Sequence, residues 1–391
     1  MLRKRHFMLL LPLVVVFSFG MDTYVPFIVE ITGEFHTSSQ LIQLTLSSYL
    51  FALAAGQLIV GILADIYGRK AVLIYSGVIF ALLSILCVFA NSVETLIFFR
   101  FLQGLGVCGL RSAAYAIVKD HYDGDEAASK LTMLYSAVSL SPIVAPLIGG
   151  LVGNIWGWRA VFVLLAALGV LCIFCAKQVN DIYQRPKKGA KLPFGFREIV
   201  QVMTNTQVLI FGLMSGAAIS CMSSFVSSVA YIVADTYTLP HAYIYISFCV
   251  VGVFMLCAGQ LSGWTILRFG RNRVFMIAFF GIIILLCLLG MMNHYHWMNY
   301  YTYIIFISLI LGLAVILNGC ALGLGLDGRT QLVGLAIAVI GIFGYGVAAF
   351  GGWLLSILGV TIENYVLILL TYFLLVAVVW KIWQRRQKNP R

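Results

Sequence analysis

The stretch Gly61-Ile-Leu-Ala-Asp65-Ile-Tyr-Gly68-Arg69-Lys70 is a short charged turn between two long uncharged hydrophobic runs. Two membrane helices joined this tightly need a hinge. Gly61 is expected to permit close helix approach, and Gly68 to permit a backbone geometry that a side chain would hinder. Asp65 can accept hydrogen bonds from the next helix start or pair with Arg69. Most short charged turns only solvate a helix end, so this turn needs further support.

The same frame returns 202 positions later, as Gly263 followed by Gly270 and Arg271. A second echo at that offset relates Pro146-Leu-Ile-Gly149-Gly150 to Ala348-Ala-Phe-Gly351-Gly352. Glycine pairs let helices touch, and a proline within a span can kink it, so packing alone would explain either echo separately. Together they predict that the chain is built twice. The predicted hinge residues are Gly61, Asp65, Gly68, Arg69, Pro146, Gly149, Gly150, Gly270 and Arg271.

The composition excludes a soluble globular domain, because 62% of residues are hydrophobic, only 10% are charged, and the mean hydropathy is +1.00. About 20 apolar residues cross a bilayer, and twelve such spans are predicted. The predicted spans are 7–32, 42–64, 71–91, 94–118, 132–156, 159–178, 207–233, 243–267, 274–293, 301–326, 331–358 and 362–383.

The predicted fold is therefore an all-α integral membrane protein with two six-helix bundles. Residues 1–179 form the N-terminal bundle, 180–205 a cytoplasmic linker, and 206–391 the C-terminal bundle. Lysine and arginine occupy every other loop, whereas the alternate loops hold Glu30, Glu34, Glu94, Asp235 and Glu363 with Arg159. The positive-inside rule then places both termini in the cytoplasm.

Several classes of function are disfavoured. The net charge of +11 is spread over the inner loops, as topology demands, so no nucleic-acid partner is expected. The nine cysteines lie in apolar spans and are expected to pack as small hydrophobes, without disulfide, metal or cofactor. No phosphate loop for ATP and no cluster of nucleophile and base is visible, so an enzyme is not expected.

The chain resembles the major facilitator superfamily, and within it the Bcr/CflA branch of drug:proton antiporters. The resemblance rests on Asp22-Thr-Tyr24-Val-Pro26, on residues 61–70, on Arg100-Phe-Leu-Gln103-Gly104-Leu-Gly106, on residues 146–150, and on Trp156-Gly-Trp158-Arg159. It covers nearly the whole chain and implies a central cavity, proton-driven export and small amphipathic substrates. Ala145 stands where the antiporter motif usually has glycine, and Tyr115 where an arginine is expected; Arg111 lies one turn earlier.

Asp22, Arg100 and Arg111 are the charges that fall well inside the predicted spans, where an ionised group costs a few kcal/mol unless paired or wetted. At 1.5 Å per residue, Asp22 lies about 12 Å before Glu30 and Arg100 about 9 Å past Glu94, so their depths nearly match. Asp22 is the predicted proton carrier, with Arg100 as its partner. The alternative is a permanent ion pair that only holds two helices.

Arg100, Gln103, Val107 and Arg111 share one helical face, which is expected to line a cavity. Arg111 is expected to attract an anionic or carbonyl group of the substrate, or to bind backbone carbonyls. The second half has no charge deep in a span and offers only uncharged polar side chains. The predicted cavity residues are Tyr24, Tyr49, Gln103, Arg111, Tyr115, Ser227, Tyr231 and Asn318, although ordinary interhelical bonding explains each one alone.

The leading interpretation is a proton-coupled exporter of small amphipathic compounds, either drugs or a metabolite such as a siderophore. We expect it to work as a monomer in the bilayer of a bacterial inner membrane. A proton-coupled importer with the same fold is the alternative. A membrane receptor or scaffold without turnover is a third class, which the deep charges and the two hinge motifs disfavour.

Overall fold

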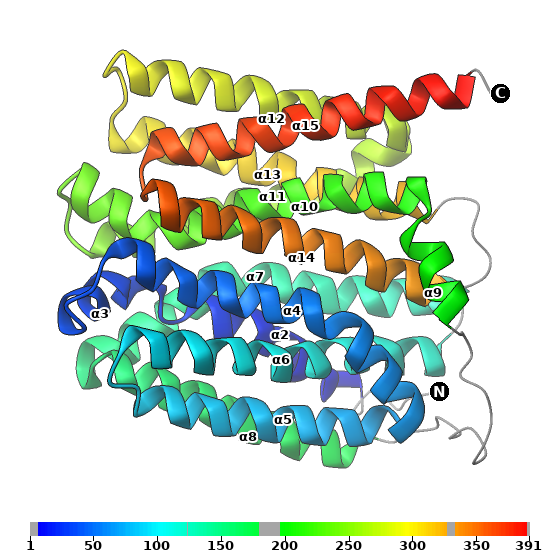
Figure 1. The fold of residues 1–391 in the computed structure, drawn as a ribbon, viewed down its shortest axis with the longest axis horizontal. Coiled ribbons are helices and arrows are strands. Elements are labelled where there is room, and N and C mark those ends of the chain that lie inside the picture. The colour runs from blue at the N-terminus through cyan, green and yellow to red at the C-terminus, as the bar shows by residue number, and fades with distance from the viewer. Residues whose placement is uncertain (1–6, 123, 180–195, 327–332, 389–391) are drawn as a thin grey trace. The chain divides into compact units, whose positions relative to one another are not determined.

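The computed structural model describes residues 7–122, 124–179, 196–326 and 333–388, and nearly all of them are helical (Figure 1). The chain divides into two compact units, residues 1–195 and 196–391. Figure 1 shows the long helices of each unit lying side by side along a common direction.

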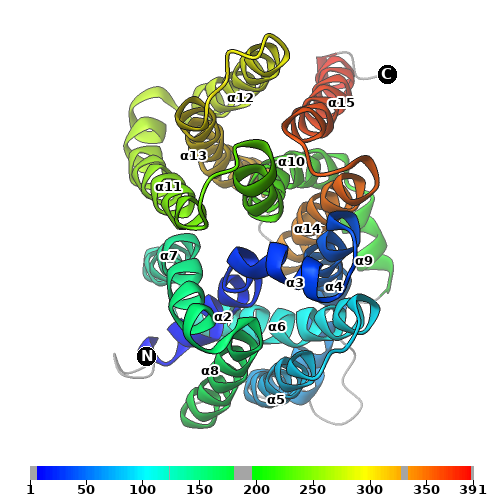
Figure 2. The ribbon, with the colours of Figure 1, turned by 90° about the vertical axis from the view of Figure 1, so that its left-hand side faces the viewer.

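In unit 1 the first span is interrupted, whereas the next five are single helices. The elements are α2 (Leu10–Asp22), the 3₁₀ turn η1 (Val25–Phe27), α3 (Ile28–Glu34), α4 (Ser39–Tyr67), α5 (Arg69–Val88), α6 (Val93–His121), α7 (Gly124–Trp156) and α8 (Trp158–Gln178). Seen end-on, α2 lies among α6, α7 and α8, and α6 is also packed against α4 and α5 (Figure 2). The first span is therefore central in this unit.

Unit 2 begins with a short helix and continues with six long ones. The elements are α9 (Phe196–Met203), α10 (Thr206–Tyr231), the π-helical turn η2 (Ile232–Thr236), α11 (Ala242–Phe269), α12 (Arg271–His294), α13 (Tyr300–Gly325), α14 (Val333–Leu358) and α15 (Ile362–Lys388). Helix α10 packs against α13, α14 and α15 (Figure 2). The first long helix thus contacts the fifth in both units, as α2 with α7 and α10 with α14.

The expected membrane fold is confirmed. In the part of the chain that the structure describes, eleven helices are long and apolar enough to cross a membrane. The twelfth predicted span falls on α7, of which Ile143–Trp156 is a shorter apolar helix. Apolar side chains such as Leu151, Leu267 and Ile277 remain largely exposed, as expected for surfaces that face hydrocarbon.

The first span is not one continuous helix, which the hydropathy pattern does not predict. Helix α2 ends at Asp22, and the chain passes through η1 before α3 begins. Pro26 has no N–H group, so it cannot bond to the carbonyl of Asp22 four residues earlier. The break places Asp22 at the end of a half-helix, where the backbone leaves the regular helical path.

Two glycine turns confirm the echo between the halves. Gly68 has φ of 90° and ψ of 153°, and it separates α4 from α5. Gly270 has φ of 82° and ψ of 144°, and it separates α11 from α12. Residues with a Cβ rarely adopt these dihedrals, so both turns require glycine.

The expectation of close helix approach at Gly61 is wrong in this structure. No atom of the described structure lies within 4 Å of an ideal Cβ at Gly61, and the same is true at Gly263. Close approach occurs instead at the second echo. An ideal Cβ at Gly149 would lie 1.9 Å from the carbonyl oxygen of Thr23, and one at Gly351 would lie 2.6 Å from Ser220 Oγ.

Part of the predicted linker lies outside the described residues, namely 180–195. The remainder holds α9, which the sequence pattern did not predict as a separate helix. Helix α9 packs against α10 and α14 within unit 2.

Candidate functional site

The site is built around Asp22, the last residue of α2. Its side chain is buried, with 1% exposed. Neither carboxylate oxygen has a hydrogen-bond partner among the described residues. A buried carboxylate of this kind is unusual, because buried polar groups in folded proteins are nearly always hydrogen-bonded.

Arg100 on α6 is completely buried and lies close enough to Asp22 to act on it electrostatically. Its Nη1 donates to the carbonyl oxygen of Gly20 at 2.7 Å and to Gln103 Oε1 at 2.6 Å. The other two guanidinium nitrogens, Nε and Nη2, have no hydrogen-bond partner in the described structure. Arg100 is therefore anchored to the helix that carries Asp22 without a direct ion pair to the Asp22 carboxylate.

Two tyrosine rings enclose the Arg100 guanidinium. Its Cζ lies 4.6 Å from the Tyr24 ring centroid and 4.4 Å from the Tyr49 ring centroid. Both tyrosines are fully buried. Cation–π attraction of this kind strengthens when the groups are removed from water, so the rings stabilise the charge without a carboxylate partner.

The hydroxyl groups of these tyrosines form hydrogen bonds to α4 and to α2. The Tyr24 hydroxyl is 2.6 Å from Thr45 Oγ1 on α4, and the Tyr49 hydroxyl donates to the carbonyl oxygen of Phe17 on α2 at 3.0 Å. The two bonds fix the orientation of each ring. One bond joins α4 to the residue just before η1, and the other joins α4 to α2.

Gln103 extends the network to α5. Its Nε2 donates to Ser84 Oγ at 2.6 Å, and Ser84 Oγ donates to the carbonyl oxygen of Phe80 at 2.7 Å. The chain of bonds orients the Gln103 amide so that its oxygen faces Arg100. The structure therefore brings together Asp22, Arg100, Tyr24, Tyr49 and Gln103.

Arg111 and Tyr115 lie farther along α6 and are only half-buried. The Arg111 Cζ lies 4.9 Å from the Phe17 ring centroid and 5.7 Å from that of Tyr115. Arg111 therefore contacts α2 more than one turn before Asp22. The predicted polar face of α6 does pack against protein, since Arg100, Gln103 and Val107 are all 0% exposed.

The predicted site residues of unit 2 are engaged within their own unit. Ser227 Oγ donates to the carbonyl oxygen of Ser223 at 2.7 Å within α10. Tyr231 is buried at the end of α10. Asn318 Oδ1 on α13 accepts from Ser215 Oγ at 2.6 Å. Ordinary bonding within or between helices accounts for the bonds of Ser227 and Asn318.

The predicted hinge residues are found at helix ends and helix contacts. Arg69 Nε donates to Asp120 Oδ2 on α6 at 3.2 Å, whereas the Asp65 side chain lies outside the described residues. In unit 2, Arg271 lies beside Gly323, whose ideal Cβ would be 3.1 Å from Arg271 Nη1. Pro146 and Gly150 are buried within the continuous helix α7.

Sequence reasoning missed Thr45, Ser84 and Phe162. Thr45 and Ser84 orient Tyr24 and Gln103, while the Phe162 ring lies 5.5 Å from that of Tyr24. A single hydroxyl or phenyl group in an apolar span carries no distinguishing signal. Which of these side chains face the site depends on how each helix is rotated about its axis, and only the structure shows this rotation.

The sequence matches the profile of the Major Facilitator Superfamily over residues 10–352. The chain belongs to this superfamily. Its members are transporters, so the chain is a multi-pass membrane transporter and not an enzyme.

Curated members of the superfamily confirm the resemblance to the Bcr/CflA branch. The chain is 25% identical over 345 residues to the bicyclomycin resistance protein homolog of Haemophilus influenzae, covering 86% of this chain and 85% of the relative. It is 35% identical over 170 residues to the chloramphenicol resistance protein of Pseudomonas aeruginosa, covering 43% and 40%. It is 29% identical over 188 residues to the multidrug resistance protein MdtL of Salmonella dublin, covering 47% and 48%.

Solved structures of superfamily transporters share the fold. A crystal structure of a D-xylose–proton symporter matches with a TM-score of 0.74 and 16% sequence identity, covering 96% of this chain and 97% of that one. The xylose transporter XylE from E. coli, in a partially occluded inward-open conformation, matches with a TM-score of 0.73 and 16% identity, covering 96% of each chain. At this level of identity the likeness establishes the fold alone.

Proposed function

We propose that the chain is a proton-coupled exporter of small amphipathic compounds in a bacterial inner membrane. The names of its relatives, which refer to resistance to bicyclomycin, to chloramphenicol and to multiple drugs, support this substrate class and direction. In this proposal residues 1–179 and 206–391 are two bundles that rock about a midplane site, with both termini in the cytoplasm. The protein acts as a monomer.

The observation that carries the proposal is the unsatisfied carboxylate of Asp22 beside a separately anchored Arg100. An ionised group inside the membrane costs about 2.5–3.5 kcal/mol on insertion scales, unless it finds a partner. Asp22 can remove this cost by binding a proton. Alternatively, it can move onto the unbonded Nε and Nη2 edge of Arg100, which has the fork geometry that binds a carboxylate through two bonds.

The two states of Asp22 give the exchange cycle. With the carboxylate apart from Arg100, Asp22 takes up a proton from the outer, acidic side. A rearrangement that brings the two groups together stabilises the ionised carboxylate and releases the proton to the cytoplasm. Because Arg100 is already held by Gly20, Gln103 and two tyrosine rings, it needs no carboxylate to remain buried. A permanent ion pair is therefore not required by the fold.

The remaining predicted residues keep supporting roles in this proposal. Tyr24, Tyr49, Gln103, Arg111 and Tyr115 form the unit 1 wall of the substrate cavity. Ser227, Tyr231 and Asn318 contribute the unit 2 wall. The turns at Gly68 and Gly270 act as hinges.

The test is transport in inside-out membrane vesicles with an acidic interior, using chloramphenicol and bicyclomycin as probes. The natural chain should accumulate a probe in exchange for protons, whereas D22N should lose at least ~90% of this accumulation, since a group that cannot titrate cannot carry the proton. D235N, at an exposed position, is the matched control and should retain normal transport.

Three outcomes would contradict the proposal. Normal accumulation by D22N would remove Asp22 from proton coupling. Probe uptake only with the reversed gradient would indicate the importer. Absence of any probe-dependent proton flux for all tested compounds, with probe binding retained, would indicate a receptor or scaffold.

A further inference from the structure

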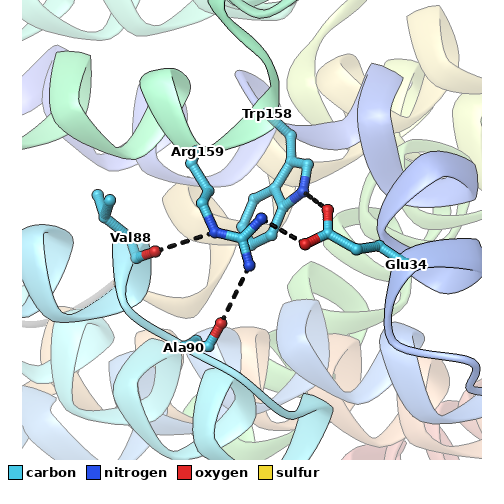
Figure 3. Close-up of polar contacts among 5 residues, drawn as sticks. All are labelled: Glu34, Val88, Ala90, Trp158 and Arg159. Carbon is cyan, nitrogen blue, oxygen red and sulfur yellow. Dashed lines mark hydrogen bonds and ion pairs between the residues drawn. The ribbon is translucent and has the colours of Figure 1, made fainter.

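A second polar cluster in unit 1 surrounds Glu34, the last residue of α3 (Figure 3). Trp158 Nε1 donates to Glu34 Oε2 at 2.5 Å, and Arg159 Nη1 donates to Glu34 Oε1. Both carboxylate oxygens are thus used. The two donors are the first residues of α8, which follows the turn at Gly157.

Arg159 joins this cluster to a third part of the unit. Its Nε donates to the carbonyl oxygen of Val88 at 3.1 Å, and its Nη2 to that of Ala90 at 3.4 Å (Figure 3). These carbonyls belong to the end of α5 and to the turn that follows it. One guanidinium therefore connects α3, α5 and α8, with a donor for each acceptor.

A chain of aromatic contacts leads from the cluster to Arg100. Trp158 is 2% exposed, and its ring centroid lies 5.9 Å from that of Phe162 in an edge-on arrangement. The Phe162 ring lies 5.5 Å from the Tyr24 ring, which in turn covers the Arg100 guanidinium. Closely packed rings transmit small displacements because the interior has little free volume.

Because the first span is broken, α3 depends on these contacts to hold its position relative to α2. A continuous helix would fix α3 relative to α2 through its backbone hydrogen bonds. Here the link between the two runs through η1, so the far end of α3 needs a fixed point of its own. The bonds to Glu34 supply it.

We propose that Glu34, Trp158 and Arg159, here called the Glu34 latch, are positioning residues for proton exchange at Asp22 and Arg100. The latch fixes the outer half of the first span, and through Trp158 and Phe162 it fixes the Tyr24 ring over Arg100. It touches neither substrate nor the exchanged proton. The inference rests on the proposed function, because its effect is exerted on the pair that carries the coupling.

The test combines hydrogen exchange with transport on the full-length protein. In E34Q the amides of residues 28–34 should exchange ~10-fold faster, the effect of losing one charge-assisted hydrogen bond. The pH midpoint of proton-driven probe accumulation in vesicles should also move by about half a unit, because the Tyr24 ring no longer holds Arg100 in one position. A merely structural anchor would change the amount of folded protein without moving this midpoint.

The matched control is E30Q. Glu30 lies on the same short helix and is exposed, and E30Q makes the same change of charge. E30Q should leave both the exchange of α3 and the pH midpoint unchanged. Equal behaviour of E34Q and E30Q in both measurements would overturn the inference.

A double variant tests whether Glu34 and Arg159 act as one unit. R159M and E34Q should each shift the midpoint by a similar amount, and R159M/E34Q by no more than R159M alone, since groups in direct contact do not act additively. Fully additive shifts would contradict a shared latch. Normal transport by D22N would instead defeat the proposed function, while faster exchange of α3 in E34Q would still show that Glu34 fastens α3.

Discussion

The most informative residue is Arg100, because it is fully buried yet forms no hydrogen bond to a carboxylate among the described residues. Its guanidinium contacts a backbone carbonyl, a side-chain amide and two tyrosine rings. Partners of this kind hold a guanidinium in place without neutralising it. Arg100 therefore keeps an attraction for an anion, and the buried Asp22 carboxylate lies close enough to feel its charge.

Replacing Gln103 tests this arrangement. Q103A removes the amide that bonds both Arg100 and Ser84, and a hydrogen bond to a charged group contributes about 1.5–3 kcal/mol. Proton-driven accumulation of chloramphenicol or bicyclomycin, whichever the natural chain accumulates, should fall about tenfold or more. Q40A, at the exposed start of α4, is the control and should transport normally. Equal transport by the two variants would argue against Gln103 as a support of Arg100.

The two parts of Tyr24 can be separated. Y24F keeps the ring over Arg100 and loses the bond to Thr45, whereas Y24L loses both. Because a desolvated cation–π contact contributes about 2 kcal/mol, Y24L should reduce transport at least about tenfold more than Y24F. The measurement is the initial rate of probe uptake in vesicles, normalised to the amount of protein. An equal loss in the two variants would mean that the hydroxyl, which both of them lack, is the important group.

At the scale of elements, the contact between the first and the fifth long helix recurs in both units, and each contact depends on a glycine. The carbonyl of Thr23 approaches Gly149 closely because α2 ends just before it and the chain turns into η1. Ser220 occupies the corresponding place beside Gly351. The conserved offset of 202 residues therefore corresponds to a repeated helix contact.

Two glycine substitutions should behave in opposite ways. G149A would place its Cβ against the Thr23 carbonyl, and overpacking of this kind costs about 1–3 kcal/mol, so the melting temperature in detergent should fall. G61A meets no atom within 4 Å, and alanine is favoured over glycine in a helix by about 1 kcal/mol, so its melting temperature should be equal or higher. A lower melting temperature for G61A as well would mean that Gly61 does have a close neighbour in the folded protein.

The turn glycines give a third prediction for the elements. G68A and G270A place a Cβ at φ of 90° and 82°, which costs about 1–2 kcal/mol at each site. Both variants should lower the melting temperature, although the space around Gly270 is open. Unchanged melting of G270A would show that the turn relaxes to another backbone conformation.

At the scale of the whole molecule, the prediction concerns orientation. Alternation of basic and acidic loops predicts that both termini face the cytoplasm. Alkaline phosphatase fused after Asn91 should therefore be active, and the same enzyme fused after Tyr122 should be inactive. Green fluorescent protein at the C-terminus should be fluorescent. The opposite pattern would invert the topology and the proposed direction of the proton gradient.

The sequence was sufficient for eleven of the twelve predicted spans in the described part of the chain, since hydropathy alone reports which segments avoid water. It also predicted the turns at Gly68 and Gly270, because a glycine followed by arginine between two apolar runs is typical of a short turn between membrane helices. The break at Asp22 was less visible, although Pro26 stands four residues later. Hydropathy averages over a window and does not respond to a single missing N–H group.

The candidate site was predicted only in its charged members. Asp22 and Arg100 stand out because charges are rare in apolar spans, whereas Ser84, Thr45 and Phe162 look like ordinary span residues. Their roles depend on the rotation of α4, α5 and α8 about their axes. The expectation that Gly61 approaches another helix was wrong. The spacing between Gly61 and Gly68 indicates a turn at Gly68, but it carries no information on which atoms lie next to Gly61.

The Glu34 latch also constrains the order in which the chain can mature during synthesis. Glu34 and Arg159 are separated by 125 positions, and ribosomes add about 5–20 residues per second, so roughly 6–25 seconds pass between the two residues. Until the sixth span has left the translocon, α3 lacks its bonds to Trp158 and Arg159. Nascent chains arrested before residue 159 should therefore expose that segment to proteases, and the released full-length chain should protect it.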